Sequence, residues 1–282
     1  MKDSYYENKV AVVTGAGGTL CSEIAIFLAQ NGARVVLIGR TEEKLQKTAD
    51  KIKALGGKYK ICACDVTNEA QMEKIAEQVK KEWGFCHFLI NGAGGNHIQA
   101  MTTETVYDES DLTSKNEDKR TFFNLDIKMF ESVLNINTVG TVIACRVYGK
   151  QMAENGGGAI INFGSMNSYC PLTRVPAYAM SKAAIVNFTQ WLGAYFAKAN
   201  IRVNAIAPGF FVNERSVNYL GSPEIGLTKR GESVINHTPM ERFGDAKDLL
   251  GCVNWLLDEH ASSFVTGITV PVDGGFLSRS GV

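Results

Sequence analysis

The sequence predicts an α/β fold in which a doubly wound parallel sheet carries helices on both faces. Short, β-branched apolar runs alternate along the chain with longer segments of helical period, and this alternation is typical of βαβ units. The runs are almost continuously apolar, as expected of strands buried on both faces. No internal repeat or linker interrupts the 282 residues, so we expect a single domain over 1–282.

Charge and composition exclude several classes of function. Lys plus Arg equal Asp plus Glu at 29 each, so no global field favours nucleic acid or a membrane surface. No apolar run approaches the ~20 residues that a membrane-spanning helix needs. The N-terminus lacks the apolar core of a signal peptide, and the seven cysteines are interpreted as reduced, buried thiols without a metal. We therefore expect a cytoplasmic protein with no nucleic-acid or membrane partner.

The first expected strand, 9–14, leads into a glycine-rich turn. This turn and the start of the helix that follows it contain Gly15, Gly17, Gly18, Thr19 and Leu20. Glycines at such a turn let backbone N–H groups approach a pyrophosphate at the positive end of the helix. The pattern predicts a dinucleotide site in a fold of the Rossmann type; a tight turn without a ligand is the alternative.

The second expected strand, 34–38, ends at Gly39 and Arg40, where the adenosine ribose of a dinucleotide would lie. An acidic residue here would bind the ribose hydroxyls and repel a 2′-phosphate, and the strand end has none. Arg40 supplies a planar cation suited to phosphate and to stacking on adenine. We therefore favour NADP(H), with NAD(H) possible; a solvated arginine at a helix start is the alternative.

A charged helix is expected over 41–55 and a third strand over 58–64, which Asp65 and Val66 follow. Both residues are placed near the expected adenine. Asp65 either accepts a hydrogen bond from the adenine amino group or caps the next helix, and the sequence leaves both interpretations open.

The fourth expected strand, 85–90, is followed by a second glycine-rich segment that contains Asn91, Ala93 and Gly94. Glycines there allow backbone contact with a cofactor ribose at the carboxyl end of the sheet. Residues 96–124 are polar and aperiodic. We interpret them as an insertion, either a lid over the pocket or, as the safer interpretation, a solvated surface excursion.

A fifth strand, 159–163, delivers Ser165 to its end, and a helix carries Tyr178 and Lys182. Because these two are four residues apart, they lie on one face of the helix. An ammonium group so close would depress the pKa of the phenol. With the Ser165 hydroxyl, the trio could transfer a proton at a carbonyl or carbinol oxygen. A packed tyrosine and an exposed lysine are the alternative, which the upstream dinucleotide motif disfavours.

The rest of the chain completes the alternation. A helical pattern over 125–140 contains Asn137, whose buried amide would need hydrogen-bond partners. A sixth strand begins at 201 and ends in a Pro-Gly break. Residues 212–240 are polar and resemble a mobile lid with short helices. A helix over 245–257 and a strand over 268–272 end the fold.

Seven short motifs occur in one order over nearly the whole chain. They are Thr14-Gly15, Asn91-Gly92-Ala93-Gly94, Asn137, Ser165, Tyr178-x-x-x-Lys182, Pro208-Gly209 and Val272-Asp273-Gly274-Gly275. Together they resemble the short-chain dehydrogenase/reductase family. More narrowly, the chain resembles the D-mannonate oxidoreductase, or fructuronate reductase, subgroup. That narrower resemblance rests on Ser165-Met166-Asn167, Pro171-Leu172-Thr173-Arg174, Asn187-Phe188-Thr189-Gln190-Trp191-Leu192, Ala207-Pro208-Gly209-Phe210-Phe211, His237-Thr238-Pro239-Met240, Ser280-Gly281-Val282 and the insertion after Gly95.

The resemblance implies roles for four residues. Tyr178 would be the general acid in reduction and the base in oxidation, and Lys182 would hold the nicotinamide ribose and lower the pKa of Tyr178. Ser165 would orient the carbonyl oxygen, and Asn137 would sustain a water-linked proton relay to Lys182. The family also implies a homotetramer. Its further cofactor contacts would fall at Pro208, Gly209 and Phe211.

The sequence departs from the family at two places. The second and third glycines of the family's turn fall at Thr19 and Cys21. We expect Gly17 and Gly18 to restore flexibility and the Thr19 hydroxyl to bind phosphate. Asn213 stands where a threonine commonly follows the Pro-Gly break and contacts the carboxamide of the nicotinamide.

A sugar-acid substrate carries a carboxylate, and carboxylate recognition favours arginine. Arg174 is the first candidate because it lies just before Tyr178; a surface or interface ion pair is the alternative. Arg215 and His237 lie in or near the expected lid, and Asn167 could bind sugar hydroxyls.

The expected activity is NAD(P)-dependent reduction of a sugar-acid ketone, foremost D-fructuronate to D-mannonate. Another polyol, keto-gluconate or 3-ketoacyl reductase is the alternative on the same fold. A dinucleotide-sensing protein without turnover is an alternative of another class, against which the complete proton-transfer set argues.

Overall fold

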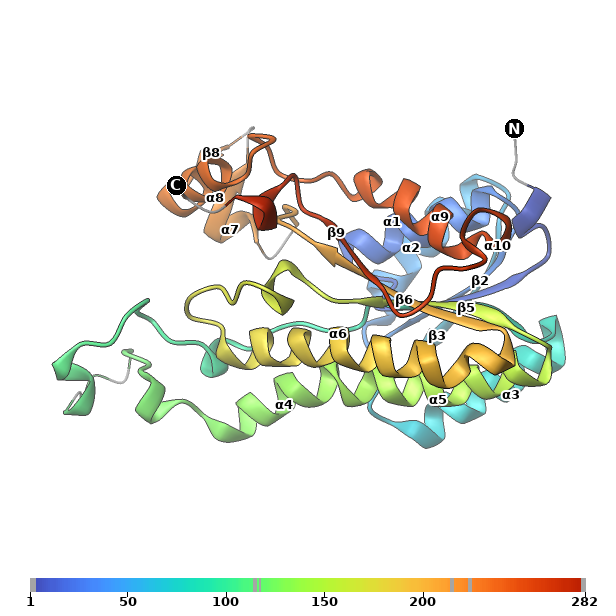
Figure 1. Ribbon diagram of the computed structural model, residues 1–282, viewed down its shortest axis with the longest axis horizontal. Coiled ribbons are helices and arrows are strands. Elements are labelled where there is room, and N and C mark those ends of the chain that lie inside the picture. The colour runs from blue at the N-terminus through green and yellow to red at the C-terminus, as the bar shows by residue number, and fades with distance from the viewer. Residues whose placement is uncertain (1–3, 114–115, 117, 214–215, 223–224, 280–282) are drawn as a thin grey trace.

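The computed structural model describes residues 4–113, 116, 118–213, 216–222 and 225–279. Within these residues, seven parallel strands form one sheet in the order β3-β2-β1-β4-β5-β6-β9 (Figure 1). The strands are β1 (Val10–Thr14), β2 (Arg34–Gly39), β3 (Lys58–Ala63), β4 (Cys86–Asn91), β5 (Gly158–Phe163), β6 (Ile201–Pro208) and β9 (Thr269–Val272). The predicted doubly wound sheet is confirmed.

Helices cover both faces of the sheet (Figure 1). One layer contains α1 (Thr19–Gln30), α2 (Glu42–Ala54) and α9 (Leu250–Leu257). The other contains α3 (Glu69–Trp83), α4 (Ile127–Asn137), α5 (Val139–Glu154) and α6 (Pro176–Phe196). In β1, Ala11 and Val13 pack into the first layer while Val10 and Val12 pack into the second. This two-sided burial explains the continuous apolar run.

The strand order reverses between β1 and β4, whose residues pair directly, Thr14 beside Asn91. At such a switch point the following loops diverge to opposite faces and leave a crevice at the carboxyl edge of the sheet. The glycine-rich turn after β1 and the segment after β4 therefore lie side by side, although 76 residues separate Gly15 from Asn91 in the chain.

The helix expected over 125–140 is interrupted. It divides into α4 and α5 at Thr138, whose backbone departs from ideal helical geometry with φ −107° and ψ −64°. Two hydroxyl bonds accompany the break: Thr138 donates to the Leu134 carbonyl at 2.6 Å, and Thr141 donates to the Asn137 carbonyl at 3.2 Å. Such back-bonding by threonine often bends helices. Asn137 thus becomes the last residue of α4.

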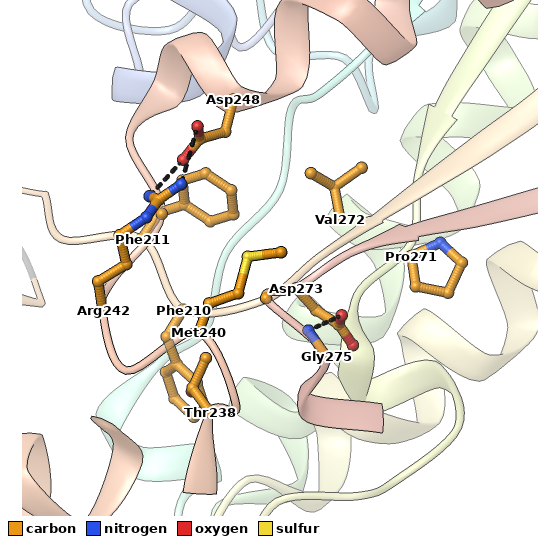
Figure 2. Close-up of a pocket in the computed structure, with 12 residues that line it drawn as sticks. Phe210, Phe211, Thr238, Met240, Arg242, Asp248, Pro271, Val272, Asp273 and Gly275 are labelled. Atoms are coloured by element: carbon orange, nitrogen blue, oxygen red, sulfur yellow. Dashed lines mark hydrogen bonds and ion pairs between the residues drawn. The ribbon is translucent and has the colours of Figure 1, made fainter. Parts of the chain in front are cut away.

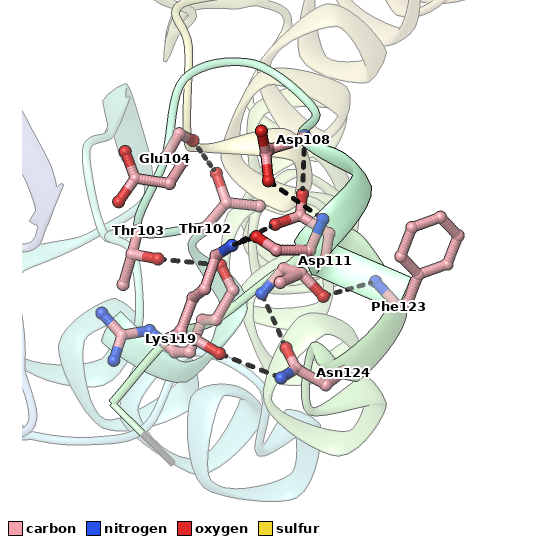
Figure 3. Close-up of polar contacts among 11 residues, drawn as sticks. Thr102, Thr103, Glu104, Asp108, Asp111, Lys119, Phe123 and Asn124 are labelled. Atoms are coloured by element: carbon pink, nitrogen blue, oxygen red, sulfur yellow. Dashed lines mark hydrogen bonds and ion pairs between the residues drawn. The ribbon is translucent and has the colours of Figure 1, made fainter. Parts of the chain in front are cut away.

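Two segments extend beyond the sheet and its helices at one end of the molecule (Figure 1). The insertion 96–124 contains three single 3₁₀ turns in its described part, and its polar groups bond mainly to one another (Figure 3). The 212–240 segment contains α7 (Val217–Leu220), β7 (Gly221–Ser222), β8 (Gly226–Leu227) and α8 (Lys229–His237). Short α10 (Glu259–Ser262) precedes β9.

The cysteines only partly follow the prediction of buried thiols. Five are buried, but Cys170 is exposed and Cys252 is half-buried. Within the described part of the chain, no cluster of three or more His, Cys, Asp or Glu residues is placed to hold a metal ion. None of the described helices is both long and apolar enough to cross a membrane.

Candidate active site

A cavity of about 480 Å³ lies at the carboxyl ends of β1 to β4. Nine of the predicted cofactor residues line it: Gly15, Gly17, Gly18, Thr19, Arg40, Asp65, Val66, Ala93 and Gly94. Asn213 also lines it. The crevice expected at the switch point is therefore present and is bordered by residues from the loops after β1, β2, β3, β4 and β6.

The turn after β1 has the geometry that a phosphate site needs. Gly15 has φ +69°, and a side chain there would meet the Gly92 carbonyl oxygen at 2.7 Å, so only glycine fits. Gly18 is the N-cap residue of α1, and no side chain accepts a hydrogen bond from the first N–H groups of this helix as its cap. The first N–H groups of α1 have no acceptor within the helix. This open, positive helix end beside the cavity fits the pyrophosphate of a dinucleotide.

One of the two departures from the family's glycine pattern, Cys21, has a structural explanation. Gly17 and Gly18 have negative φ values; Gly17 is required because a side chain would meet the Lys44 side chain on α2 at 2.8 Å. Cys21 fits because residue 92 is a glycine: the Cys21 Sγ occupies the space that a side chain at position 92 would need. Gly92 and Cys21 therefore fit as a pair.

Arg40 is exposed at the cavity, and Lys44 and Lys47 of α2 line the same end. Asp65 does not cap the next helix, because Asn68 accepts from Gln71 N and is the N-cap of α3. The Asp65 carboxylate instead accepts from the backbone and hydroxyl of Thr67, at 2.9 and 2.7 Å. Partial burial raises its pKa, but these hydrogen bonds and the charge of Arg40 outweigh burial and lower it.

Seven predicted cofactor residues lie outside this cavity's lining: Leu20, Asn91, Tyr178, Lys182, Pro208, Gly209 and Phe211. The Asn91 amide is buried and donates to Asn162 at 2.9 Å, so it joins β4 to β5. Phe211 lines a separate cavity of about 380 Å³, where its ring lies near the Arg242–Asp248 ion pair (Figure 2). The predicted cofactor contact of the Phe211 side chain is thus not supported by its position.

Ser165, Tyr178 and Lys182 come together as their spacing predicts. Ser165 follows β5, and its hydroxyl lies close enough to Tyr178 on α6 to lower the pKa of the phenol. The Ser165 hydroxyl also accepts from Asn167 N at 3.1 Å. The Ser168 hydroxyl donates to the Lys182 carbonyl at 2.7 Å, which fixes the loop after β5 to the helix that carries both other residues.

The expected effect of Lys182 on Tyr178 is not seen. Burial raises the pKa of Tyr178, and the hydrogen bond with Ser165 lowers it only in part. Lys182 Nζ instead donates to the Phe163 carbonyl at 2.7 Å, and it lies 5.6 Å from the centre of the Tyr178 ring. Burial also lowers the pKa of Lys182 to about 8, because desolvation penalises its charged form.

Asn137 finds the partners that a buried amide needs. Its Nδ2 donates to the carbonyls of Gly95 and Val133 at 2.7 and 2.8 Å, and its Oδ1 accepts from Gly95 N at 3.1 Å. A side chain at Gly94 would overlap the Asn137 amide and lie 3.8 Å from Lys182 Nζ. The loop after β4 therefore lies between Asn137 and Lys182. Asn137, the residue expected to take part in the proton relay, is thus close to Lys182.

The predicted substrate residues are not all near each other. Asn167 is buried, and its Oδ1 accepts from Leu172 N at 2.9 Å. Arg174 has φ +73°, and its Nε donates to the Thr102 carbonyl at 2.9 Å. His237 is exposed at the end of α8, with Nδ1 bonded to the Ser233 carbonyl. Arg215 lies outside the described residues.

Comparison with known proteins agrees with this geometry. The family model described as short chain dehydrogenase matches residues 9–219. The chain belongs to the short-chain dehydrogenase/reductase family. It is an oxidoreductase of that family, and the family binds a nicotinamide dinucleotide.

Three similar proteins cover almost the whole chain. The uncharacterized oxidoreductase UxuB of Bacillus subtilis is 44% identical over 97% of this chain and 96% of its own length. A crystal structure from Haemophilus influenzae, a provisionally assigned D-mannonate oxidoreductase with bound NAD, has a TM-score of 0.91 at 43% identity and covers 98% of this chain and 97% of its own. The 2-dehydro-3-deoxy-D-gluconate 5-dehydrogenase of Dickeya dadantii is 30% identical over 97% of both chains.

Proposed function

We propose that the protein is an NAD(P)-dependent reductase of a sugar-acid ketone, with D-fructuronate and D-mannonate as its foremost substrate pair. The observation that carries the proposal is the contact of the Ser165 and Tyr178 side chains next to Lys182, beside a cavity that fits a dinucleotide. A phenolic proton and a hydroxyl donor at one point are what reduction of a carbonyl needs.

Each catalytic side chain has one task in this mechanism. When bound, a nicotinamide would supply the hydride chemistry at the substrate carbon. In reduction, Tyr178 gives its phenolic proton to the carbonyl oxygen, and Ser165 holds that oxygen by a hydrogen bond. The raised pKa of Tyr178 keeps the proton in place until it is needed. Lys182 binds the ribose, and Asn137, close to Lys182, supports the return of a proton from solvent.

The choice of a sugar acid is supported by two kinds of observation. The Haemophilus and Dickeya proteins are named for sugar-acid substrates. In this chain, the buried Asn167 lies two residues from Ser165, and its Nδ2 makes no hydrogen bond to the described residues, so it remains able to donate to a sugar hydroxyl. Arg174 supplies a cation on the loop that leads to Tyr178.

For the cofactor, we favour NADP(H). Arg40, Lys44 and Lys47 place three cations at one end of the cavity, where a 2′-phosphate would be neutralised. The similar Haemophilus structure contains NAD, so NAD(H) remains the competing cofactor. Arg40→Ala should raise the KM for NADPH far more than the KM for NADH; equal effects on both would contradict the preference.

The decisive experiment follows the absorbance of the reduced nicotinamide while the protein is offered D-fructuronate and a panel of other keto-acids, each with NADH and with NADPH. Turnover of D-fructuronate above all others supports the proposal. A preference for an uncharged keto-sugar, a keto-gluconate or a 3-ketoacyl substrate selects the alternative reductase. Tight cofactor binding with no turnover of any ketone would instead indicate a dinucleotide sensor.

A further inference from the structure

Residues 95–102, which we call the strap, are hydrogen-bonded to both ends of α4. At the start of the strap, Gly95 N donates to Asn137 Oδ1 at 3.1 Å, and Asn137 Nδ2 donates back to the Gly95 carbonyl at 2.7 Å. Further along the strap, the Gln99 carbonyl accepts from Asp126 N at 3.3 Å. Asp126 is the N-cap of α4 and Asn137 is its last residue, so the strap reaches from the end of this helix to its start.

The strap is also bonded to the loop that leads to Tyr178. Thr102 N donates to the Arg174 carbonyl at 3.0 Å, and Arg174 Nε donates to the Thr102 carbonyl at 2.9 Å. Arg174 therefore binds one residue of the strap with both its backbone and its side chain. Its own backbone is in the left-handed region, with φ +73°, which is rare for a non-glycine residue and persists only where the surrounding structure enforces it.

Between these attachment points, the strap contributes to the packing around Tyr178. Ala100 of the strap is fully buried together with Val133 of α4 and Ala177 of α6, and Tyr178 packs against this cluster. Because close-packed interiors transmit displacements, the position of the phenol depends on how the strap, α4 and α6 are held together. The strap and the start of α6 are joined by the bonds of Arg174.

We propose that Arg174 is a positioning residue for Tyr178, because its Nε bond to the Thr102 carbonyl keeps the strap, and with it Ala100, against the start of α6. This inference rests on the proposed function and gives Arg174 a task other than that of a carboxylate ligand. The two tasks act on different constants. A cation that binds the substrate lowers KM, whereas a bond that sets the geometry of the proton donor raises kcat.

Replacing Arg174 by lysine separates these tasks. Lysine keeps the positive charge on an unbranched stem but has a methylene group where arginine has Nε, so the bond to the Thr102 carbonyl is lost. In Arg174→Lys and Arg174→Gln alike, kcat should fall by on the order of 10- to 100-fold with KM changed much less, because a small misplacement of a catalytic group has an effect of this size. A wild-type kcat in Arg174→Lys with a raised KM in Arg174→Gln would overturn the proposal and favour the carboxylate ligand.

Arg120 provides a matched control in the same stretch of chain. Its Nε donates to the Met101 carbonyl at 3.1 Å, one residue before Thr102. Arg120→Lys therefore removes a hydrogen bond of the same kind from the strap, but this bond lies within the insertion and does not reach α6. The kcat of Arg120→Lys should stay close to that of the wild type. A fall as large as that of Arg174→Lys would mean that any loosening of the insertion has this effect, and the particular role of Arg174 would be lost.

Hydrogen exchange keeps this inference separate from the proposed function. Exchange of the backbone amides, followed by mass spectrometry in the free protein, needs no substrate. Arg174→Lys should exchange faster than the wild type both in the strap and in residues 174–182, whereas Arg120→Lys should match the wild type in residues 174–182. Unchanged exchange in Arg174→Lys would overturn the proposal. The kcat comparison uses whichever ketone the wild type reduces, so a protein that rejects D-fructuronate contradicts the proposed substrate and leaves the role of Arg174 open to the same test.

Discussion

At the scale of single residues, the site contains two ionisable groups whose pKa values are shifted in opposite directions. Burial raises the pKa of Tyr178 and lowers the pKa of Lys182 to about 8. The first shift keeps a proton on the phenol, which reduction requires. The second places the titration of the lysine close to neutral pH.

Removing the Tyr178 hydroxyl should separate chemistry from binding. In Tyr178→Phe the phenolic proton is lost while the ring still packs, so kcat should fall by about 10² to 10⁴-fold, the usual contribution of a positioned acid. The Kd of the reduced cofactor, measured by fluorescence titration, should remain close to that of the wild type. Brisk turnover by this variant would mean that another group donates the proton.

Lys182 should make cofactor affinity depend on pH. Below about pH 8 its Nζ is an ammonium that favours the anionic cofactor; above this value it becomes a neutral amine. Lys182 holds its proton more tightly in the complex with NADPH than in the free protein. The Kd of NADPH should therefore rise with pH above 8, by at most about tenfold per pH unit. Lys182→Met should bind more weakly with no such rise. A wild-type Kd that stays constant from pH 7 to 10 would contradict this role.

At the scale of elements, the strands and the catalytic spacing could be predicted because they depend on local pattern. Short runs rich in apolar residues identified the seven strands, and the four-residue separation placed Tyr178 and Lys182 on one face of α6. The break at Thr138 was missed because apolar periodicity continues across it. The Gly92–Cys21 contact was also missed, since it depends on which loops approach each other in space.

The contact between the β1–α1 turn and the loop after β4 can be tested by a double-mutant cycle. Gly92→Ala places a methyl group into the Cys21 Sγ and should lower the free energy of unfolding by about 1–3 kcal/mol, the usual cost of overpacking. Cys21→Ala removes the sulfur, and the nearest atom of residue 21 would then lie 3.6 Å from the added carbon. The double variant should therefore be more stable than the sum of the single changes, measured by urea unfolding. Additive losses would show that the two positions do not conflict.

At the scale of the whole molecule, two exposed aromatic surfaces lie on different parts of the fold. On α6, Trp191 and Tyr195 stack with ring centres 5.0 Å apart, yet 57% and 67% of their surfaces are exposed. Near the C-terminal strand, Phe264 is fully exposed and Ile268 partly so. Soluble monomers rarely expose such groups together, and two separate self-complementary patches are what a tetramer of two-fold symmetry needs.

We therefore expect a homotetramer that one charge at each surface would divide. Trp191→Glu places four carboxylates in the α6 interfaces and should leave dimers joined through the C-terminal surface, because buried unpaired charge is strongly unfavourable. Phe264→Glu should leave dimers joined through α6, and the double variant should be monomeric by sedimentation equilibrium. Circular dichroism would verify that each variant remains folded. A double variant that still sediments as a tetramer would place the interfaces elsewhere, whereas a monomeric wild type would remove the tetramer and leave both aromatic surfaces facing solvent.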